Sequence, residues 1–172
     1  MEYFDVVNEH DIIIGKASRE ECHRNPKLIH RATNAFIFNS EKLDHILRIK
    51  RTSAVDTEQG KWTILVGEHN TLGEAYEHSI RRGLREELGI RKIDCKEISY
   101  VLIKMKHQSE YHKNYIAVYK GDIKNLKLCE EEIEKIEFIK VSDLLEDIKI
   151  NKENYVSYIE SALETITTFI SK

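Results

Sequence analysis

The sequence predicts an α/β (α+β) fold in which a mixed β-sheet is flanked by helices. Three observations indicate this. Strand-length apolar runs dominate residues 3–66, apolar residues take a helical spacing over 74–88, and further apolar runs precede an amphipathic segment at 155–170. No Gly/Ser linker, composition break or internal repeat divides the 172 residues. We therefore expect one domain over residues 1–172, with an N-terminal β-hairpin extension and a C-terminal helix.

The first part of the chain is rich in predicted strands. Residues 3–7 and 11–15 are typical of two strands joined by a polar turn at 8–10. Ser18 is expected to cap a short helix, because Glu21 follows it at the spacing of a capping box. Further strands are predicted at 28–39, 46–49 and 62–66.

The period of the apolar residues then changes from that of a strand to that of a helix. Apolar residues mostly four apart predict a helix over 74–88, and Gly89 is typical of a helix C-terminus. Ser142 is predicted to cap a short helix over 143–148. Strands are predicted at 97–106, 114–120 and 134–140, and a terminal helix at 155–170.

Composition excludes several classes of partner. The chain has 27 Lys+Arg and 30 Asp+Glu, a formal net charge of −3, so we expect no nucleic-acid partner. Its apolar runs are far shorter than the roughly 20 residues of a membrane helix, so we expect no membrane partner. Cys22, Cys95 and Cys129 form no CxxC pair and indicate free thiols in a reducing compartment, here the cytoplasm.

The segment from Trp62 to Ile90 carries the most chemical information. It reads as a strand, a loop with two glycines, and a helix that ends in the adjacent carboxylates Glu86 and Glu87. Mg²⁺ shares a few carboxylates with a diphosphate substrate, and carboxylates on one helix supply that arrangement. A Glu-Glu pair is also typical of a solvated helix end, and that alternative stays open at this point.

This segment resembles the signature of the Nudix superfamily, in which a glycine and a glutamate precede Arg-Glu-X-X-Glu-Glu-X-Gly and an aliphatic residue. The matching positions are Glu74, Arg82, Glu86, Glu87, Gly89 and Ile90. Two positions depart from it: Gly83 stands where the glutamate after the arginine belongs, and Glu68 stands where the opening glycine belongs, with Gly67 just before it. The resemblance implies a Nudix fold and a metal-dependent pyrophosphatase, from which Gly83 removes one metal-binding carboxylate.

A second resemblance covers more of the chain. Residues 5–11, 22–24, 30–32, 36–39 and 138–148 are similar to type I isopentenyl-diphosphate isomerases and their Nudix relatives. This implies that His23, His30 and His69 hold a divalent metal, with His112 as a candidate fourth ligand. A nitrogen-rich site suits Zn²⁺ or another transition metal better than Mg²⁺. The alternative is that His23 and His30 flank Pro26 on an exposed connection and bind no metal.

The isomerase chemistry matches less well than its metal site. The family uses a cysteine two residues before the third histidine and a glutamate on a later strand. Gly67 occupies the cysteine position, and the later strand is expected to offer His112 and Asn114 in place of acidic residues. A glycine cannot donate a proton, so we do not expect double-bond isomerisation.

Basic residues complete the predicted site. Arg31, Arg48 and Arg51 are predicted to bind the phosphates of a substrate, although each is also typical of a solubilising surface charge. Arg82 is expected to pair with Glu86 along the helix. The histidines without motif context are expected at the surface, namely His10, His45, His78 and His107, and Cys22 is expected to be a buried, inert thiol.

The leading function is hydrolysis of a diphosphate linkage in a nucleoside diphosphate-X or related compound. The cofactor is a divalent metal, Mg²⁺ or Mn²⁺, with Zn²⁺ at the histidine cluster. Glu86 and Glu87 would hold the metal, and Glu74 or Glu68 would orient or deprotonate the attacking water. Two alternatives stay open: an isopentenyl-diphosphate isomerase and a non-catalytic nucleotide-binding module. The family resemblance also implies a homodimer.

Overall fold

The computed structural model describes residues 2–171, which form two compact units made of interleaved segments. The first unit contains the chain up to Asn34 together with Gly67–Gly83 and Glu97–Tyr115. The second contains Ala35–Val66, Leu84–Lys96 and the chain from Ile116 onward. The prediction of a single domain over residues 1–172 stays a prediction.

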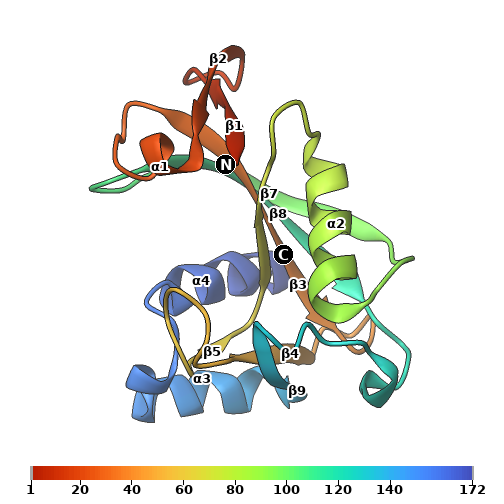
Figure 1. Ribbon diagram of the computed structural model, residues 1–172. Coiled ribbons are helices and arrows are strands. Elements are labelled where there is room, and N and C mark those ends of the chain that lie inside the picture. Colours follow the sequence, from red (N-terminus) through yellow and green to blue (C-terminus); the bar gives the residue numbers. More distant parts are fainter. Residues whose placement is uncertain (1, 172) are drawn as a thin grey trace. The chain divides into compact units, whose positions relative to one another are not determined.

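The first unit begins with an antiparallel hairpin of β1 (Tyr3–Val7) and β2 (Ile13–Ser18), red in Figure 1. Its cluster of buried apolar side chains includes Phe4, Val6, Ala17 and Cys22. It also contains α1 (Arg19–Cys22), the first part of β3 (Ile29–Phe38), the end of β6 (Val66–His69), most of α2 (Tyr76–Leu88), most of β7 (Cys95–Lys104) and most of β8 (Ser109–Val118). Strand β3 is a common neighbour, since β1, β6 and β8 each pair with it.

The second unit is built around β4 (His45–Arg51), which pairs antiparallel with β3, β5 (Trp62–Thr63) and β9 (Ile133–Lys140). Its 3-10 helices are η1 (Ile123–Asn125) and η2 (Lys152–Asn154), and its further α-helices are α3 (Val141–Ile150) and α4 (Ile159–Ile170). Fully buried side chains such as Phe36, Ile46 and Leu144 form its interior. The sheet and helices confirm the α+β fold class.

The predicted capping box at Ser18 is confirmed. The Ser18 hydroxyl accepts a hydrogen bond from the Glu21 amide, and the Glu21 carboxylate accepts one from the Ser18 amide at 2.8 Å. These two bonds satisfy amides that a helix N-terminus leaves unpaired. The box fixes where α1 begins and so places His23 as its C-cap residue.

The predicted end of the helix at Gly89 is also confirmed. Helix α2 ends at Leu88, and Gly89 follows with φ +70°, a conformation that costs glycine little. The Gly89 amide donates to the Arg85 carbonyl at 3.0 Å. The helix begins at Tyr76 because Glu74 belongs to the preceding loop, where it is an acceptor of hydrogen bonds.

Several predicted boundaries are wrong. The strand expected over 62–66 is two short strands, β5 and β6, with Ile64 and Leu65 between them. The second strand starts at Ile13, because the Asn8 side chain accepts from the His10 and Ile12 amides and extends the turn. Helix α3 has Lys140 at its N-cap, and the Ser142 hydroxyl donates to the Asp143 carboxylate instead of capping it. The last helix starts at Ile159, after the 3-10 helix η2.

Candidate metal centre and catalytic carboxylates

Four side chains in the first unit converge: His23, His30, His69 and Glu110. One ligand atom from each lies within 4.8 Å of the corresponding atoms of the others. The residues come from four elements, namely the C-cap of α1, strand β3, the end of β6 and strand β8. The structure thus brings together the three predicted histidines from separate segments and adds a carboxylate.

The cluster packs against the buried aromatic ring of Phe4, and parts of it are buried. His30 is fully buried and Glu110 is 4% exposed. Phe4, itself fully buried, stacks on His30 and on His69 with ring centroids 5.1 Å apart in both pairs. A buried carboxylate surrounded by imidazoles and an aromatic wall is costly without a compensating charge or hydrogen bonds.

The nitrogen atoms of this cluster fit a bound metal. Within residues 2–171, the buried Nε2 atoms of His23 and His30 have no hydrogen-bond partner. Such orphaned groups cost about 1–3 kcal/mol each. One oxygen of Glu110 lies 3.1 Å from Nε2 of His30 and 3.1 Å from Nε2 of His69. The contact with His30 does not have the geometry of a hydrogen bond. Three imidazoles and one carboxylate form a donor set suited to Zn²⁺ or a similar transition metal.

The charges of these groups also suit a cation. Burial, with help from neighbouring His69 and His30, lowers the pKa of His23 to about 4, so its imidazole is neutral at pH 7. Burial by itself raises the pKa of Glu110, but the close approach of His112, His30 and His69 outweighs it and holds that pKa well below its usual range. Metal ligands must be deprotonated, so a neutral His23 and an ionised Glu110 are in the required form.

Around Glu110 lies a chain of polar contacts that orients it. Gln108 donates to one carboxylate oxygen at 2.9 Å, and Nε2 of His112 lies within hydrogen-bond distance of the other. The Asn34 amide lies 3.0 Å from Nδ1 of His112. An amide NH₂ group only donates hydrogen bonds, so Nδ1 of His112 is the acceptor. Nε2 of His112 therefore carries the ring proton and donates a hydrogen bond to Glu110. Partners of this kind fix the orientation of a metal ligand.

His112 therefore differs from the prediction that made it a fourth metal ligand. Its Nε2 is directed to Glu110, and the fourth member of the converging group is Glu110 itself. The strand predicted over 114–120 is β8, which starts at Ser109 and ends at Val118. Glu110 and His112 stand two apart, so strand alternation places both on one face; this spacing is the signal that sequence reasoning missed.

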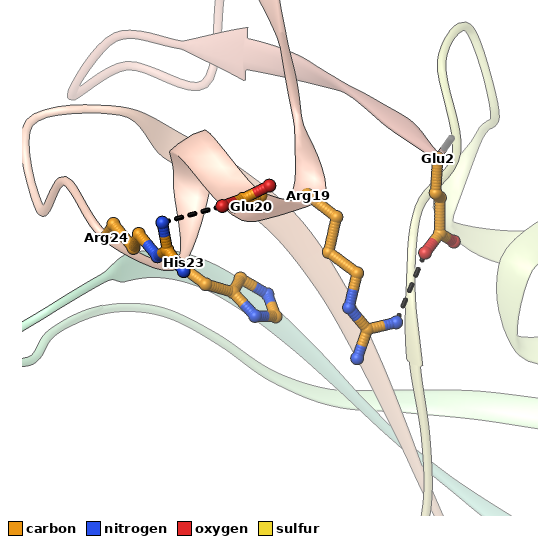
Figure 2. Close-up of a pocket in the computed structure, with 5 residues that line it drawn as sticks. All are labelled: Glu2, Arg19, Glu20, His23 and Arg24. Carbon is orange, nitrogen blue, oxygen red and sulfur yellow. Dashed lines mark hydrogen bonds and ion pairs between the residues drawn. The ribbon is translucent and has the colours of Figure 1, made fainter. Parts of the chain in front are cut away.

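A pocket of about 440 Å³ opens beside His23, lined also by Glu2, Arg19, Glu20 and Arg24. Figure 2 shows the two arginines with His23 between them in this view. Arg19 is ion-paired to Glu2 at 3.1 Å, and Arg24 to Glu20 at 2.6 Å. Two arginines and two glutamates thus line the pocket as ion pairs beside His23.

The loop before α2 is held by Glu74. Its carboxylate accepts from the Thr71 amide at 2.9 Å, from the Thr71 hydroxyl, and from two nitrogens of Arg82. Burial opposes ionisation, but the Arg82 and Thr71 hydrogen bonds prevail and lower the pKa of Glu74. Arg82 also donates to Glu68 at 2.8 Å, so this one guanidinium bridges two predicted catalytic carboxylates. The predicted partner of Arg82 was Glu86; these two carboxylates were not foreseen.

The paired carboxylates at the end of α2 belong to the second unit. Glu86 is exposed and lies 3.1 Å from Arg85. Glu87 is half-buried, and its backbone carbonyl accepts from the Cys129 amide at 2.9 Å. Both remain predicted metal ligands.

The three predicted phosphate-binding arginines have protein partners. Arg31 donates to Asp11 at 2.6 Å. Arg48 donates to Glu137, Asp147 and Tyr155, and its guanidinium lies 4.4 Å from the Trp62 ring centroid. Arg51 donates to the Thr57 carbonyl. Their binding of substrate stays a prediction.

Other residues discussed from the sequence are placed as follows. His10, His78 and His107 are exposed, as predicted, whereas His45 is half-buried with Nδ1 3.2 Å from Asp44. Cys22 is fully buried, as predicted, and burial raises the pKa of its thiol to about 11; its inertness stays a prediction.

Known proteins are similar to this chain in sequence and in fold. A family model, the NUDIX domain, matches residues 28–159. The chain belongs to the NUDIX family. An "Isopentenyl-diphosphate Delta-isomerase 2" of Photorhabdus laumondii is 30% identical over 68% of this chain and 66% of its own length. An "Isopentenyl-diphosphate Delta-isomerase 1" of Aromatoleum aromaticum is 27% identical over 94% of this chain and 90% of its own length.

Solved structures agree on the Nudix fold. The crystal structure of DR0079 from Deinococcus radiodurans matches with a TM-score of 0.77 at 20% identity, over 95% of this chain and 98% of that one. The resemblance to Nudix proteins with an isomerase-like branch is thereby confirmed. Among the helices in residues 2–171, none combines the length and apolar character that crossing a membrane requires.

Proposed function

We propose that this NUDIX protein hydrolyses a diphosphate linkage in a nucleoside diphosphate-X or a related compound, with the help of a divalent metal. The observation that carries the proposal is the convergence of His23, His30, His69 and Glu110, with orphaned imidazole nitrogens, in a chain that keeps Glu86 and Glu87 of the Nudix signature. A bound divalent cation supplies charge neutralisation at phosphorus and makes water more acidic.

The protein's own residues have distinct parts in this reaction. Glu86 and Glu87 would hold Mg²⁺ or Mn²⁺, and the three histidines with Glu110 would hold Zn²⁺ or a similar ion. His112 would orient Glu110. Glu74 or Glu68 would orient the attacking water and accept its proton, and the Arg82 bridge keeps both carboxylates in place. Water attacks phosphorus and the phosphoanhydride P–O bond breaks, which releases two phosphate products and a proton.

The pocket beside His23 suits the approach of an anionic substrate. Arg19 and Arg24 line it in exposed ion pairs with Glu2 and Glu20, and exposed ion pairs are weak, so a phosphate group could compete for the two guanidinium groups. Arginine is well suited to binding phosphate. We propose that these two residues, with Arg31, Arg48 and Arg51, are the cationic partners of the substrate.

The test is a screen of nucleoside diphosphate compounds with Mg²⁺, Mn²⁺ or Zn²⁺, in which wild type is compared with Glu86→Gln. We expect wild type to release a phosphate product and Glu86→Gln to lose about 10²-fold or more of this activity, since transition-state charge stabilisation is commonly worth that much. Equal release by wild type and Glu86→Gln would contradict the proposal. Tight nucleotide binding without turnover would favour the non-catalytic module.

A second candidate is isopentenyl-diphosphate isomerisation, which the histidine cluster and the named relatives favour. Its weakness is Gly67, which stands at the position of the family's proton-donating cysteine. Incubation with isopentenyl diphosphate in deuterated water distinguishes the two. Deuterium exchange into the substrate would support isomerisation, whereas unchanged substrate excludes it.

A further inference from the structure

The two departures from the Nudix signature are a reciprocal exchange of residues. Glycine is expected at position 68 and glutamate at position 83, but the chain has Glu68 and Gly83. Position 68 lies on β6 and position 83 in α2, so the sequence alone gives no reason to connect them.

The structure shows that these two positions touch. A Cβ atom placed on Gly83 would lie 2.4 Å from Cγ of Glu68 and 2.9 Å from its Oε1. Real Cβ atoms do not come so close to another atom, so the Glu68 side chain occupies the space in which a side chain at position 83 would begin. Each unusual residue therefore accounts for the other, because Glu68 has room only while residue 83 is glycine.

Glu68 is also held in this position. Arg82 donates to its Oε2 at 2.8 Å while donating to Glu74, and the Glu68 side chain is 18% exposed. A carboxylate with this degree of burial and a charged hydrogen-bond donor is pre-organised. An ion pair with Arg82 is enough to explain where the Glu68 carboxylate lies. It does not explain why α2 has a glycine, which weakens a helix, at the position that the Glu68 side chain covers.

We infer that Glu68 supplies from β6 the metal-binding carboxylate that a signature glutamate at position 83 supplies from the helix. The inference rests on the proposed function and assigns Glu68 a more definite part in it. In a carboxylate set for Mg²⁺ or Mn²⁺, what matters is an oxygen ligand in the right place, whichever element carries it.

The experiment is Mn²⁺ titration followed by electron paramagnetic resonance of free Mn²⁺, with protein whose histidine cluster is first loaded with Zn²⁺. Four proteins are compared with wild type: Glu68→Gln, Gly83→Glu, the exchange variant Glu68→Gly/Gly83→Glu, and the control Glu97→Gln, which removes an exposed carboxylate of the same unit. Far-UV circular dichroism checks that each is folded.

We expect Glu68→Gln to bind Mn²⁺ about 10-fold or more weakly, the loss typical of damage to a metal site. The exchange variant should recover most of the wild-type affinity, and Glu97→Gln should bind as wild type does. Wild-type affinity in Glu68→Gln would overturn the inference. So would a folded exchange variant that binds no more tightly than Glu68→Gln.

The outcome is separable from that of the proposed function, because it is read from metal binding and not from turnover. If Glu68→Gln binds Mn²⁺ normally while wild type hydrolyses a diphosphate compound, the inference fails and the proposed function stands. If Mn²⁺ affinity depends on Glu68 but no compound is hydrolysed, the proposed function fails and the metal assignment to Glu68 stands.

Discussion

Among single residues, the buried carboxylate of Glu110 distinguishes the observed cluster from the histidine site that the sequence predicts. The three histidines could be predicted from a resemblance, because each stands in a recognisable segment. Glu110 was missed, because its local signal, the spacing of two residues from His112, does not identify its partners on other strands. Only the fold brings it to His30 and His69.

Replacement of Glu110 by glutamine tests this carboxylate. Glu110→Gln keeps the size of the side chain but removes the charge that balances a cation, so we expect Zn²⁺ affinity to fall about 10–100-fold. Competition with a zinc chelator measures it. The matched control is Glu97→Gln, an exposed carboxylate on β7 paired with Lys113. Equal Zn²⁺ affinity in Glu110→Gln and wild type would rule out Glu110 as a metal ligand.

Glu58 gives a residue-scale prediction for pH. Burial acts to raise its pKa, but hydrogen bonds from Lys61 and Ser157 dominate and lower the pKa to about 2 from 4.5. A carboxyl with a lowered pKa in the folded state adds stability above pH 4.5, and this is lost as the pH falls from 4.5 to about 2. Glu58→Gln should therefore lower the Tm at pH 7 by a few degrees and by much less near pH ~2.5. Equal Tm losses at both pH values would contradict this.

At the scale of elements, most helices and strands could be predicted from periodicity, turn residues and caps. The helix over 74–88 follows from apolar residues four apart, and its C-terminus from Gly89. What could not be predicted was the use of Glu74 as a hydrogen-bond acceptor, which starts α2 later, and the side-chain bond that removes Ser142 from the cap. Both depend on partners that local propensity does not identify.

The contact between Glu68 and Gly83 predicts that Gly83→Ala changes the free energy of unfolding in the direction opposite to that expected from helix propensity. By helix propensity, Gly83→Ala should stabilise the protein by about 1 kcal/mol. Because the new Cβ would lie 2.4 Å from Cγ of Glu68, we expect Gly83→Ala to destabilise instead. In a Glu68→Ala background the same change should stabilise. Urea unfolding of the four proteins measures this cycle, and a stabilising Gly83→Ala in the wild-type background would refute the contact.

In the molecule as a whole, the chain passes between its two compact units within β3, β6, α2, β7 and β8, whose bounds cross the unit boundaries. We therefore expect one cooperative unfolding transition, as for a single domain. Fluorescence of Trp62, the single tryptophan, reports on the second unit, and far-UV circular dichroism reports on both. Coincident transitions would support the prediction, and two separate midpoints would contradict it. A midpoint that rises with protein concentration would support the predicted homodimer.

The central claim is that this NUDIX protein directs water to phosphorus in a diphosphate compound. The most direct measurement is hydrolysis in ¹⁸O-labelled water with Mn²⁺ and Zn²⁺ present, followed by ³¹P nuclear magnetic resonance of the products. We predict label in one phosphate product of the wild-type reaction and none above background for Glu86→Gln. Products without label, or equal turnover by the two proteins, would contradict the claim.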